Sequence, residues 1–573
     1  MKYFPKKLTI TWIRNSYKSG KLTPMELIKE IMRRVESNDY RNIWIAKPSM
    51  EFIKPYIDNL AIKDIEKCPL WGIPFAIKDN IDVKGLITTA GCEEYGYLAK
   101  ESAFVVKKLI DAGAIPLGKT NLDQFATGLV GTRSPYGEVH NALNEELISG
   151  GSSSGSAVSV ALGEVAFALG TDTAGSGRVP AALNALVGYK PSLGAWSTNG
   201  VVPACASLDC VTVFANNLEE VEVVNSVARG FDNKCCWSKE YDDIVKKMPK
   251  KICLPKEDLE FFGQYKEIYK VKWYEALERI VSLGIEINYI DYSIFQEAAS
   301  ILYDGPWVAE RWKDLGDFVK SNSGAVFPVT KEVLQSGGKA ENTAVKVFEA
   351  MHKLQQYKMI VKDLLKDSVI IMPTVGGTFT RDEVRENPIE TNSLMGKYTN
   401  HCNLLNMCAV AVPENTDDTV LPFGITIFGL AKDEGLILKT AEEFLEKESV
   451  KLAVCGLHME DMELESQLIE LDAELIGTTK TSKDYKLIKL NTAPEKPGLI
   501  RVKNNGKAIE VQVYRISKSK LGKFLTNITA PLGIGDIELE SGEIVKGFIC
   551  EGYVEKESED ISDYESFKKY KNR

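Results

Sequence analysis

Two serines in glycine-rich surroundings are the side chains of this 573-residue sequence best placed to do chemistry. Ser152 follows a pair of glycines, and Ser176 follows Ala174 and Gly175. Glycine lets the chain turn tightly, so a serine hydroxyl and neighbouring backbone N–H groups can converge on one point. That arrangement suits a nucleophile whose oxyanion is held by backbone amides. Ordinary glycine and serine loops are the alternative interpretation.

A serine nucleophile needs a base, and histidine is scarce. Distance in sequence does not forbid a Ser/His/Asp triad, because the fold assembles such triads. The histidine contexts are nonetheless poor, since His140 lies in a polar loop and His352 in a lysine-rich, helix-like stretch. No histidine lies near either serine in sequence; the four are His140, His352, His401 and His458.

Lys78 is the better candidate base. It follows an apolar run from Ile73 to Ile77, which is typical of a buried strand. Burial disfavours the ammonium form and lowers the pKa of a lysine, and a neutral amine can accept a serine proton. An ion pair between Lys78 and Asp79 at the end of the strand is the structural alternative.

Lys78, Ser152 and Ser176 together resemble the amidase signature family in order and spacing. The resemblance implies that Lys78 is the base, that Ser152 relays the proton next to a cis peptide bond, and that Ser176 is the nucleophile. Ser153 and Ser154 compete for the relay role. The family's relay is the first serine after the paired glycines, which selects Ser152.

The loop that carries Ser176 supplies the expected oxyanion donors. Asp172 and Arg178 are expected to brace this loop rather than to react, and direct contact of Arg178 with the substrate is the alternative. The N–H groups expected to hold the oxyanion are those of Thr173, Ala174, Gly175 and Ser176.

Further segments narrow the resemblance to the allophanate hydrolases of that family. They imply that Tyr303 and Arg311 bind the substrate, a urea that carries a carboxylate. A guanidinium holds a carboxylate through two parallel hydrogen bonds, and two residues eight apart on one helix differ by about 80° and can share a face. The segments are KTNLDQFATGLVGTRSPYG (119–137), GTDTAGSGRVPAALNALVGYKPSLG (170–194), STNGVVPACASLDCVTVFA (197–215) and ILYDGPWVAERW (301–312).

The resemblance therefore implies an amidohydrolase that converts allophanate to ammonia and carbon dioxide through N-carboxycarbamate and an acyl-enzyme. One alternative is an amidase for another small carboxylated amide, such as malonamate or a carboxyguanidine. Another is a subunit of a tRNA-dependent amidotransferase, which the appended C-terminal region and the lack of basic patterning disfavour. A non-catalytic scaffold is disfavoured by the intact lysine and serines.

The elements around these residues predict an α/β fold. Short apolar strands at 70–79 and 114–119 enclose a helix-like segment at 104–113, and residues 24–37 show helical spacing after the capping residue Thr23. A helix of small residues from Ser156 to Leu162 leads into the strand that delivers GTDTAGS. The resemblance implies a mixed central sheet flanked by helices over residues 1–446, with further core strands at 367–375 and 421–429.

A second, strand-rich domain is predicted after the charged stretch at 442–451. Residues 447–555 resemble the small α+β C-terminal domain of allophanate hydrolases, which is similar to γ-glutamylcyclotransferase. The resemblance makes His458 a candidate acid or base for a second reaction step, and a scaffold role is the alternative. Residues 556–573 lie outside the resemblance and are predicted to be a charged, solvated tail.

The composition limits the classes of partner and the compartment that we expect for this protein. A net charge of -10 without a basic run argues against nucleic acid and anionic membranes, and no apolar run approaches the ~20 residues of a membrane span. Eleven cysteines without a C-x-x-C pair predict a reducing cytoplasm and no metal. We expect no cofactor, because the sequence has no P-loop and EAMHK at 349–353 only faintly resembles a biotin-attachment sequence. We expect a homodimer whose substrate is supplied by a separate urea carboxylase.

Overall fold

The computed structural model describes residues 4–303, 305–414 and 421–573; the side chain of Tyr303 also lies outside the described part. The chain divides into two compact units. Lys7–Phe444 forms the first, and Leu445–Arg573 forms most of the second. Each unit is built around its own buried core.

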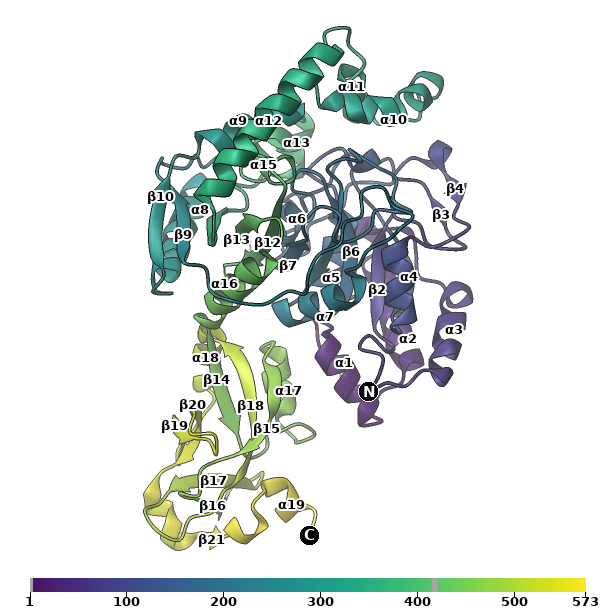
Figure 1. Ribbon diagram of the computed structural model, residues 1–573. Helices are drawn as coiled ribbons and strands as arrows, with labels where there is room; N and C mark the ends of the chain where they lie inside the picture. Colours follow the sequence, from purple (N-terminus) through teal and green to yellow (C-terminus); the bar gives the residue numbers. More distant parts are fainter. Residues whose placement is uncertain (1–3, 304, 415–420) are drawn as a thin grey trace. The chain divides into compact units, whose positions relative to one another are not determined.

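The first unit is built on a mixed β-sheet of eleven described strands (Figure 1). Its central strands are buried along their whole length, as expected for a sheet that helices cover on both faces. A separate ladder joins β3 (Ile87–Thr88) and β4 (Tyr97–Leu98). From edge to edge the strands of the large sheet are β1 (Trp44–Ala46), β5 (Ile115–Thr120), β2 (Pro74–Lys78), β6 (Phe167–Asp172), β8 (Cys210–Ala215), β7 (Val187–Lys190), β12 (Met407–Pro413), β13 (Gly424–Leu430), β11 (Ser368–Pro373), β9 (Lys251–Pro255) and β10 (Glu286–Ile290).

Strand β2 organises the part of the sheet that carries the predicted site. It pairs in parallel with β5 on one side and with β6 on the other. Lys78 is the last residue of β2 and Asp172 the last of β6, so both strands end at the same edge. The pairings from β6 through β8, β7, β12 and β13 to β11 are antiparallel, and those from β11 through β9 to β10 are parallel. The predicted mixed sheet is therefore confirmed.

The predicted helices at 24–37, 104–113 and 156–162 form, as α2, α4 and α5. A capping box between Thr23 and Glu26 starts α2 (Pro24–Ser37), and α4 (Phe104–Asp111) connects the segments that hold β2 and β5. The small side chains of α5 (Ser154–Ala161) let it pack closely on β2 and β6, and the whole helix is buried. The remaining helices of this unit are α1 (Ile10–Lys18), α3 (Met50–Asn59), α6 (Val179–Leu183), α7 (Leu218–Ala228), α8 (Lys266–Val281), α9 (Ser293–Tyr303), α10 (Val308–Ser321), α11 (Pro328–Ser336), α12 (Ala344–Leu364), α13 (Arg381–Glu386), α14 (Glu390–Met395), α15 (His401–Leu404) and α16 (Glu434–Glu446).

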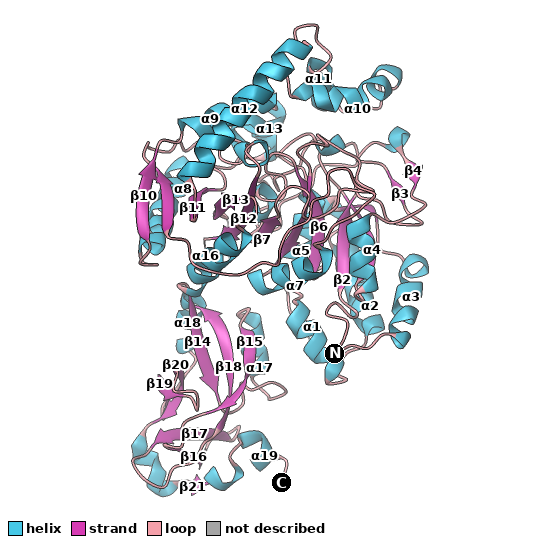
Figure 2. Cartoon of the chain, viewed as in Figure 1, coloured by secondary structure: helices cyan, strands magenta, loops and turns pink. Residues whose placement is uncertain are grey.

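The second unit is strand-rich, as predicted (Figure 2). One sheet has the order β15 (Glu474–Lys480), β18 (Glu510–Ser517), β14 (Ser449–Val454), β20 (Ile544–Cys550), β19 (Leu532–Glu538), and the other has β17 (Lys496–Arg501), β16 (Tyr485–Leu490), β21 (Glu559–Asp560). The two sheets share a core, in which Val511 and Val545 meet Leu487 and Leu499. Its helices are α17 (Glu465–Glu470), α18 (Lys518–Leu525) and α19 (Phe567–Lys571).

The last residues are not the solvated tail that their charge predicts. Strand β21 and helix α19 lie within 556–573, and Ile561, Phe567 and Tyr570 are buried in the core of the second unit. The many charged residues of this segment hide three apolar side chains at positions that face the core. Burial of such side chains stabilises the domain by about 1.5–3 kcal/mol each, which outweighs the polarity of the segment.

Candidate active site

Lys78 and Ser152 are in direct contact. Lys78 is buried at the end of β2, and its Nζ donates hydrogen bonds to Ser152 Oγ and to Thr171 Oγ1, both at 2.8 Å. Thr171 comes from β6, the strand beside β2. The parallel pairing of β2 and β6 thus places the amine next to the glycine-rich turn at 150–152.

Burial favours the neutral form of the Lys78 amine. Desolvation lowers the pKa of Lys78 to about 7, although the carboxylates of Asp123, Asp209 and Asp172 favour the charged form. The alternative ion pair with Asp79 is not formed, because Asp79 pairs with Lys119 at 3.1 Å. Lys78 has no ion pair within the described part of the chain. A substantial fraction of neutral amine is therefore present near neutral pH.

The three consecutive serines have different roles in the structure. Only Ser152 contacts Lys78, and the Gly151–Ser152 peptide bond is cis, as the resemblance implies. Ser153 Oγ instead donates to the carbonyl of Thr171 at 3.1 Å, and Ser154 Oγ points to the carbonyl of Asn121 at 3.4 Å. Among the three hydroxyls, the geometry therefore favours Ser152 as the partner of the amine.

Asp123 holds the turn at Ser152 and has no role in the sequence prediction. Its carboxylate accepts the N–H groups of Val130, Gly131 and Arg133, and its own N–H donates to the carbonyl of Ser152 at 3.1 Å. A Cβ atom added to Gly151 would lie 2.0 Å from Asp123 Oδ2, so only glycine fits there. The signal was present in the segment at 119–137, which the resemblance used without assigning this residue.

The loop after β6 carries Ser176 and is braced as predicted. The Asp172 carboxylate accepts two hydrogen bonds from Arg178, at 2.9 and 3.0 Å, and one from the N–H of Gly177. Burial by itself would raise the pKa of Asp172, but the Arg178 charge and these hydrogen bonds hold it below its usual value. The loop that carries Ser176 is therefore fixed by a fully buried ion pair.

One predicted oxyanion donor is already engaged. The N–H of Gly175 donates to the Asp172 carboxylate at 2.9 Å. The expectation that the Gly175 N–H faces the substrate is therefore wrong. The N–H groups of Thr173, Ala174 and Ser176 have no acceptor among the described residues. Gly175 is needed for another reason: its φ is +137° and a Cβ atom there would lie 2.3 Å from Thr399 Oγ1.

A segment far away in sequence completes the brace. Thr399 Oγ1 donates to the carbonyl of Ala174 at 2.8 Å, and Asn403 Nδ2 donates to the carbonyl of Asp172 at 2.8 Å. Asn403 also donates to the carbonyl of Leu208. These side chains flank and form the short helix α15, and no sequence motif pointed to them.

The hydroxyl of Ser176 is nearly buried, with 4% of the residue exposed. Its Oγ forms no hydrogen bond with Ser152 or Lys78 among the described contacts. Lys78 and Ser152 are thus brought together as a pair, and Ser176 lies in the loop that follows β6, the strand next to β2.

The proposed substrate-binding residues do not share one helix. α9 ends at Tyr303 and α10 begins at Val308, because Pro306 cannot continue a helix and restricts the residue before it. Arg311 is buried in α10, and its Nη1 donates to Thr127 Oγ1 at 2.9 Å. The side chain of Tyr303 lies outside the described residues.

Arg311 acts electrostatically on Asp209, which is bonded to the loop that carries Ser176. The carboxylate of Asp209 accepts a hydrogen bond from Thr173 Oγ1 and from the N–H groups of Ala204 and Cys205. Burial raises the pKa of Asp209 to about 6, and these bonds and the charge of Arg311 oppose that rise. The guanidinium therefore lies within electrostatic reach of the loop that carries Ser176.

His458 lies in the second unit, in an aromatic setting. Its ring stacks on Phe548 and meets the edge of Phe524, each with 5.1 Å between centroids. Its Nε2 hydrogen-bonds to Gln467 at 3.0 Å, and burial lowers its pKa. These contacts describe a packed, neutral imidazole.

No group of three or more potential metal ligands occurs among the described residues. The eleven cysteines carry free thiols. Within the described ranges, no helix is both long and apolar enough to cross a membrane.

Both units match known domains. Residues 26–438 match the amidase family, and residues 450–572 match the allophanate hydrolase C-terminal domain. A solved structure of the allophanate hydrolase of Kluyveromyces lactis is similar over 99% of both chains, with 38% identity and a TM-score of 0.72.

Similar sequences include larger and smaller proteins. The urea amidolyase of Saccharomyces cerevisiae is 38% identical over 98% of this chain, which spans only 33% of that protein. The urea amidolyase of Lachancea kluyveri is 41% identical over 88% of this chain and 30% of its own length. A glutamyl-tRNA(Gln) amidotransferase subunit from Methanosarcina mazei is 34% identical over 72% of this chain and 91% of its own.

Proposed function

Because the chain belongs to the amidase family and carries an allophanate hydrolase C-terminal domain, we propose that it hydrolyses allophanate and releases ammonia from its terminal amide. Family membership makes it a hydrolase of amide C–N bonds. The observation that carries the proposal is the buried contact between Lys78 Nζ and Ser152 Oγ, next to the loop that holds Ser176.

The proposed reaction begins with proton transfer. Neutral Lys78 accepts the proton of Ser152, and Ser152 accepts the proton of Ser176 as the Ser176 oxygen attacks the terminal amide carbonyl. The pKa of about 7 for Lys78 supports this step, since a base near the working pH is effective both as acceptor and as donor. The proton returns through Ser152 to the leaving nitrogen, which departs as ammonia.

The acyl-enzyme that remains is an ester between Ser176 and the carboxylated carbamoyl group. A water molecule attacks this ester, Lys78 and Ser152 again carry the proton, and N-carboxycarbamate leaves. N–H groups of Thr173, Ala174 and Ser176 stabilise the oxyanion in both halves, each by about 3 kcal/mol. The Asp172–Arg178 pair supports this role because it fixes the backbone that presents these groups.

Substrate recognition is assigned to Arg311 and Tyr303. Arg311 is fixed by Thr127 at 2.9 Å and lies near Asp209, which bonds the nucleophile loop. A buried guanidinium suits a small substrate with a carboxylate, and it distinguishes allophanate from neutral amides. Malonamate and carboxyguanidine share the carboxylate, so they remain competing substrates of the same pocket.

The amidotransferase alternative receives less support. The Methanosarcina mazei protein matches 72% of the chain, whereas the Kluyveromyces lactis allophanate hydrolase matches both units. Residues 450–572, the domain named after allophanate hydrolases, are the observation that favours the hydrolase.

We also propose a source for the allophanate substrate. Allophanate forms by carboxylation of urea, and the similarity to urea amidolyases supports a functional link with a urea carboxylase.

A homodimer in the cytoplasm is the proposed working form. Apolar side chains exposed on one face of α12, those of Val345, Phe348 and Met359, offer area for such a contact. Light scattering on the purified protein measures the assembly directly.

Ammonia release from allophanate by the purified protein tests the proposed function. We expect turnover by the wild type and at least ~10³-fold less by Ser176→Ala. Ser154→Ala is the matched control, since it removes a nearby buried hydroxyl that does not contact Lys78. An active Ser176→Ala variant would refute the nucleophile, and a wild type that releases ammonia only from neutral amides would refute the substrate.

A further inference from the structure

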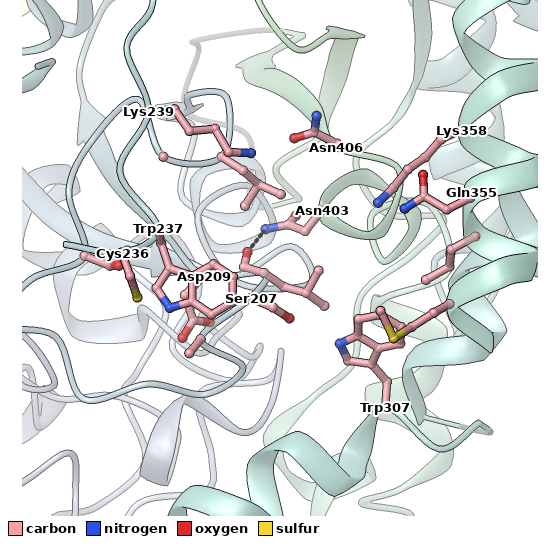
Figure 3. Close-up of a pocket in the computed structure, with 17 residues that line it drawn as sticks. Ser207, Asp209, Cys236, Trp237, Lys239, Trp307, Gln355, Lys358, Asn403 and Asn406 are labelled. Carbon is pink, nitrogen blue, oxygen red and sulfur yellow. Dashed lines mark hydrogen bonds between the residues drawn. The ribbon is translucent and has the colours of Figure 1, made fainter. Parts of the chain in front are cut away.

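A cavity of about 440 Å³ lies in the first unit, next to the loop that carries Ser176 (Figure 3). Its walls come from α12, from loops near 194, 207 and 237, and from the segment at 403–406. Lys78, Ser152, Ser176 and Arg311 do not line it. Its volume falls in the range of ordinary small-molecule sites, about 300–1,000 Å³.

Two lysines reach into this cavity from opposite walls. Lys239 extends from the loop after Trp237, and Lys358 extends from α12, as Figure 3 shows. Neither ammonium group has a carboxylate or hydrogen-bond partner among the described residues. Burial lowers the pKa of Lys358, and the nearby charge of Lys239 lowers it further. Two cations that repel each other across a cavity favour an anion between them.

The surface between the two lysines is mixed, and Figure 3 shows the amides of Asn403 and Asn406 between them. Trp237, Met351 and Leu354 line it, and Gln355 adds an amide. The indole N–H of Trp307, in the same wall as Lys358, has no hydrogen-bond partner among the described residues. Two separated cations, with amide groups and apolar side chains around them, match a small organic dianion whose carboxylates the lysines and amides can hold.

The one carboxylate in the lining does not neutralise these cations. Asp209 is hydrogen-bonded to Thr173, Ala204 and Cys205. Those bonds direct its oxygens toward the loop residues rather than toward Lys239 or Lys358, with which it forms no ion pair among the described residues. The cavity therefore keeps a net positive character.

We propose that this cavity is a second binding site, which takes a small aliphatic dicarboxylate between Lys239 and Lys358. The site is separate from the one that holds Ser176, and it does not depend on the proposed reaction. It is nonetheless coupled to that site by structure. Asn403 lines the cavity and also holds the carbonyl groups of Asp172 and Leu208, so an occupant touches a residue that positions the nucleophile loop.

Calorimetric titration of the full chain with malonate and with succinate tests this site. We expect binding that Lys358→Met and Lys239→Met each weaken at least tenfold, because each removes one of two charges that grip the ligand. Lys358→Arg should retain most of the affinity. Lys362→Met, which removes an exposed charge one turn further along α12, is the matched control and should bind as the wild type does. Binding should also weaken as ionic strength rises.

Arg311→Ala separates this site from the proposed substrate pocket. We expect the Lys358-dependent binding to persist in that variant. Affinity that is unchanged in both lysine variants, or lost only in Arg311→Ala, would overturn the second site. Sulfate that binds as tightly as the dicarboxylates would overturn the ligand class. Failure of the wild type to hydrolyse allophanate would instead refute the proposed function and leave the titration result intact.

Discussion

Lys78 Nζ lies 2.8 Å from Ser152 Oγ, although 74 positions separate the two residues in sequence. The contact exists because β2 and β6 are parallel neighbours that end at one edge of the sheet, where α5 begins just after the glycine turn. The amine is buried there without a carboxylate partner among the described residues. Its chemistry is consequently set by desolvation, which opposes its charge.

The state of Lys78 predicts the pH dependence of the reaction. Only the neutral amine can accept a proton, and burial places its pKa at about 7. As the pH increases toward 7 the fraction of neutral amine grows, so kcat/KM should rise about tenfold per pH unit and then level off above pH 7. Lys78→Met should lose at least ~10³-fold activity at every pH. A wild-type profile that is flat between pH 5.5 and 8 would contradict the assignment of the base.

Ser152 and Ser153 should respond differently to the same substitution. Ser152→Ala removes the hydroxyl that accepts a hydrogen bond from Lys78, and we expect kcat to fall ~10³-fold and stability to fall by about 1 kcal/mol. Ser153→Ala removes a hydrogen bond to the carbonyl of Thr171, which should cost about 1 kcal/mol of stability and leave the chemistry largely intact. Parallel kinetics and thermal unfolding of the two variants measure both effects. The reverse pattern would exclude Ser152 as the relay.

Local patterns predicted the parts of the fold that local forces determine. The apolar run before Lys78 forms β2, the capped repeat at 24–37 forms α2, and the small-residue stretch before GTDTAGS forms α5 and β6. Period and capping are short-range properties, so these elements can be read from neighbouring residues alone. The chemistry of the lysine and serines follows from residue type in the same way.

The parts that could not be predicted depend on contacts between distant segments. Thr399 and Asn403 brace the loop that carries Ser176 across 225 and 231 positions, and no spacing rule connects such residues. The break between α9 and α10 did have a local signal, since proline at 306 cannot continue a helix. The eight-residue spacing of Tyr303 and Arg311 also suits one face of a single helix, and the sequence prediction followed that spacing rather than the proline.

The ion pair of Asp172 and Arg178 predicts a stability effect that can be separated from activity. Asp172→Asn leaves a buried guanidinium without its charge partner, which should cost about 3–5 kcal/mol. A double variant, Asp172→Asn with Arg178→Met, removes the orphaned charge and should recover part of that loss. Both variants should be inactive, because both lose hydrogen bonds that shape the loop carrying Ser176. Thermal unfolding and ammonia release distinguish the two effects, and an active double variant would contradict the bracing role.

Arg311 predicts selectivity for carboxylated substrates. Arg311→Ala should lower kcat/KM for allophanate about 100-fold, since a charge-assisted contact to a buried carboxylate contributes about 3 kcal/mol. A neutral amide of similar size should lose far less. Arg311→Lys keeps the charge without the planar fork and should fall between the two. Steady-state kinetics on both substrates provide the comparison, and equal losses would refute the contact.

His458 is predicted to stabilise the second unit rather than to react. Its imidazole stacks on Phe548 and makes a T-shaped contact with Phe524, and its Nε2 is bonded to Gln467, so one nitrogen and one face are already engaged. His458→Leu should lower the stability of the unit by about 1–2 kcal/mol, through loss of that bond and of the aromatic contacts. Phe548→Leu is the matched control, because it disturbs the same stack and keeps the imidazole. Thermal unfolding, with ammonia and carbon dioxide release assayed in parallel, should show both variants destabilised and both products formed at wild-type rates. Loss of carbon dioxide release in His458→Leu alone would instead identify the imidazole as an acid or base in a second step.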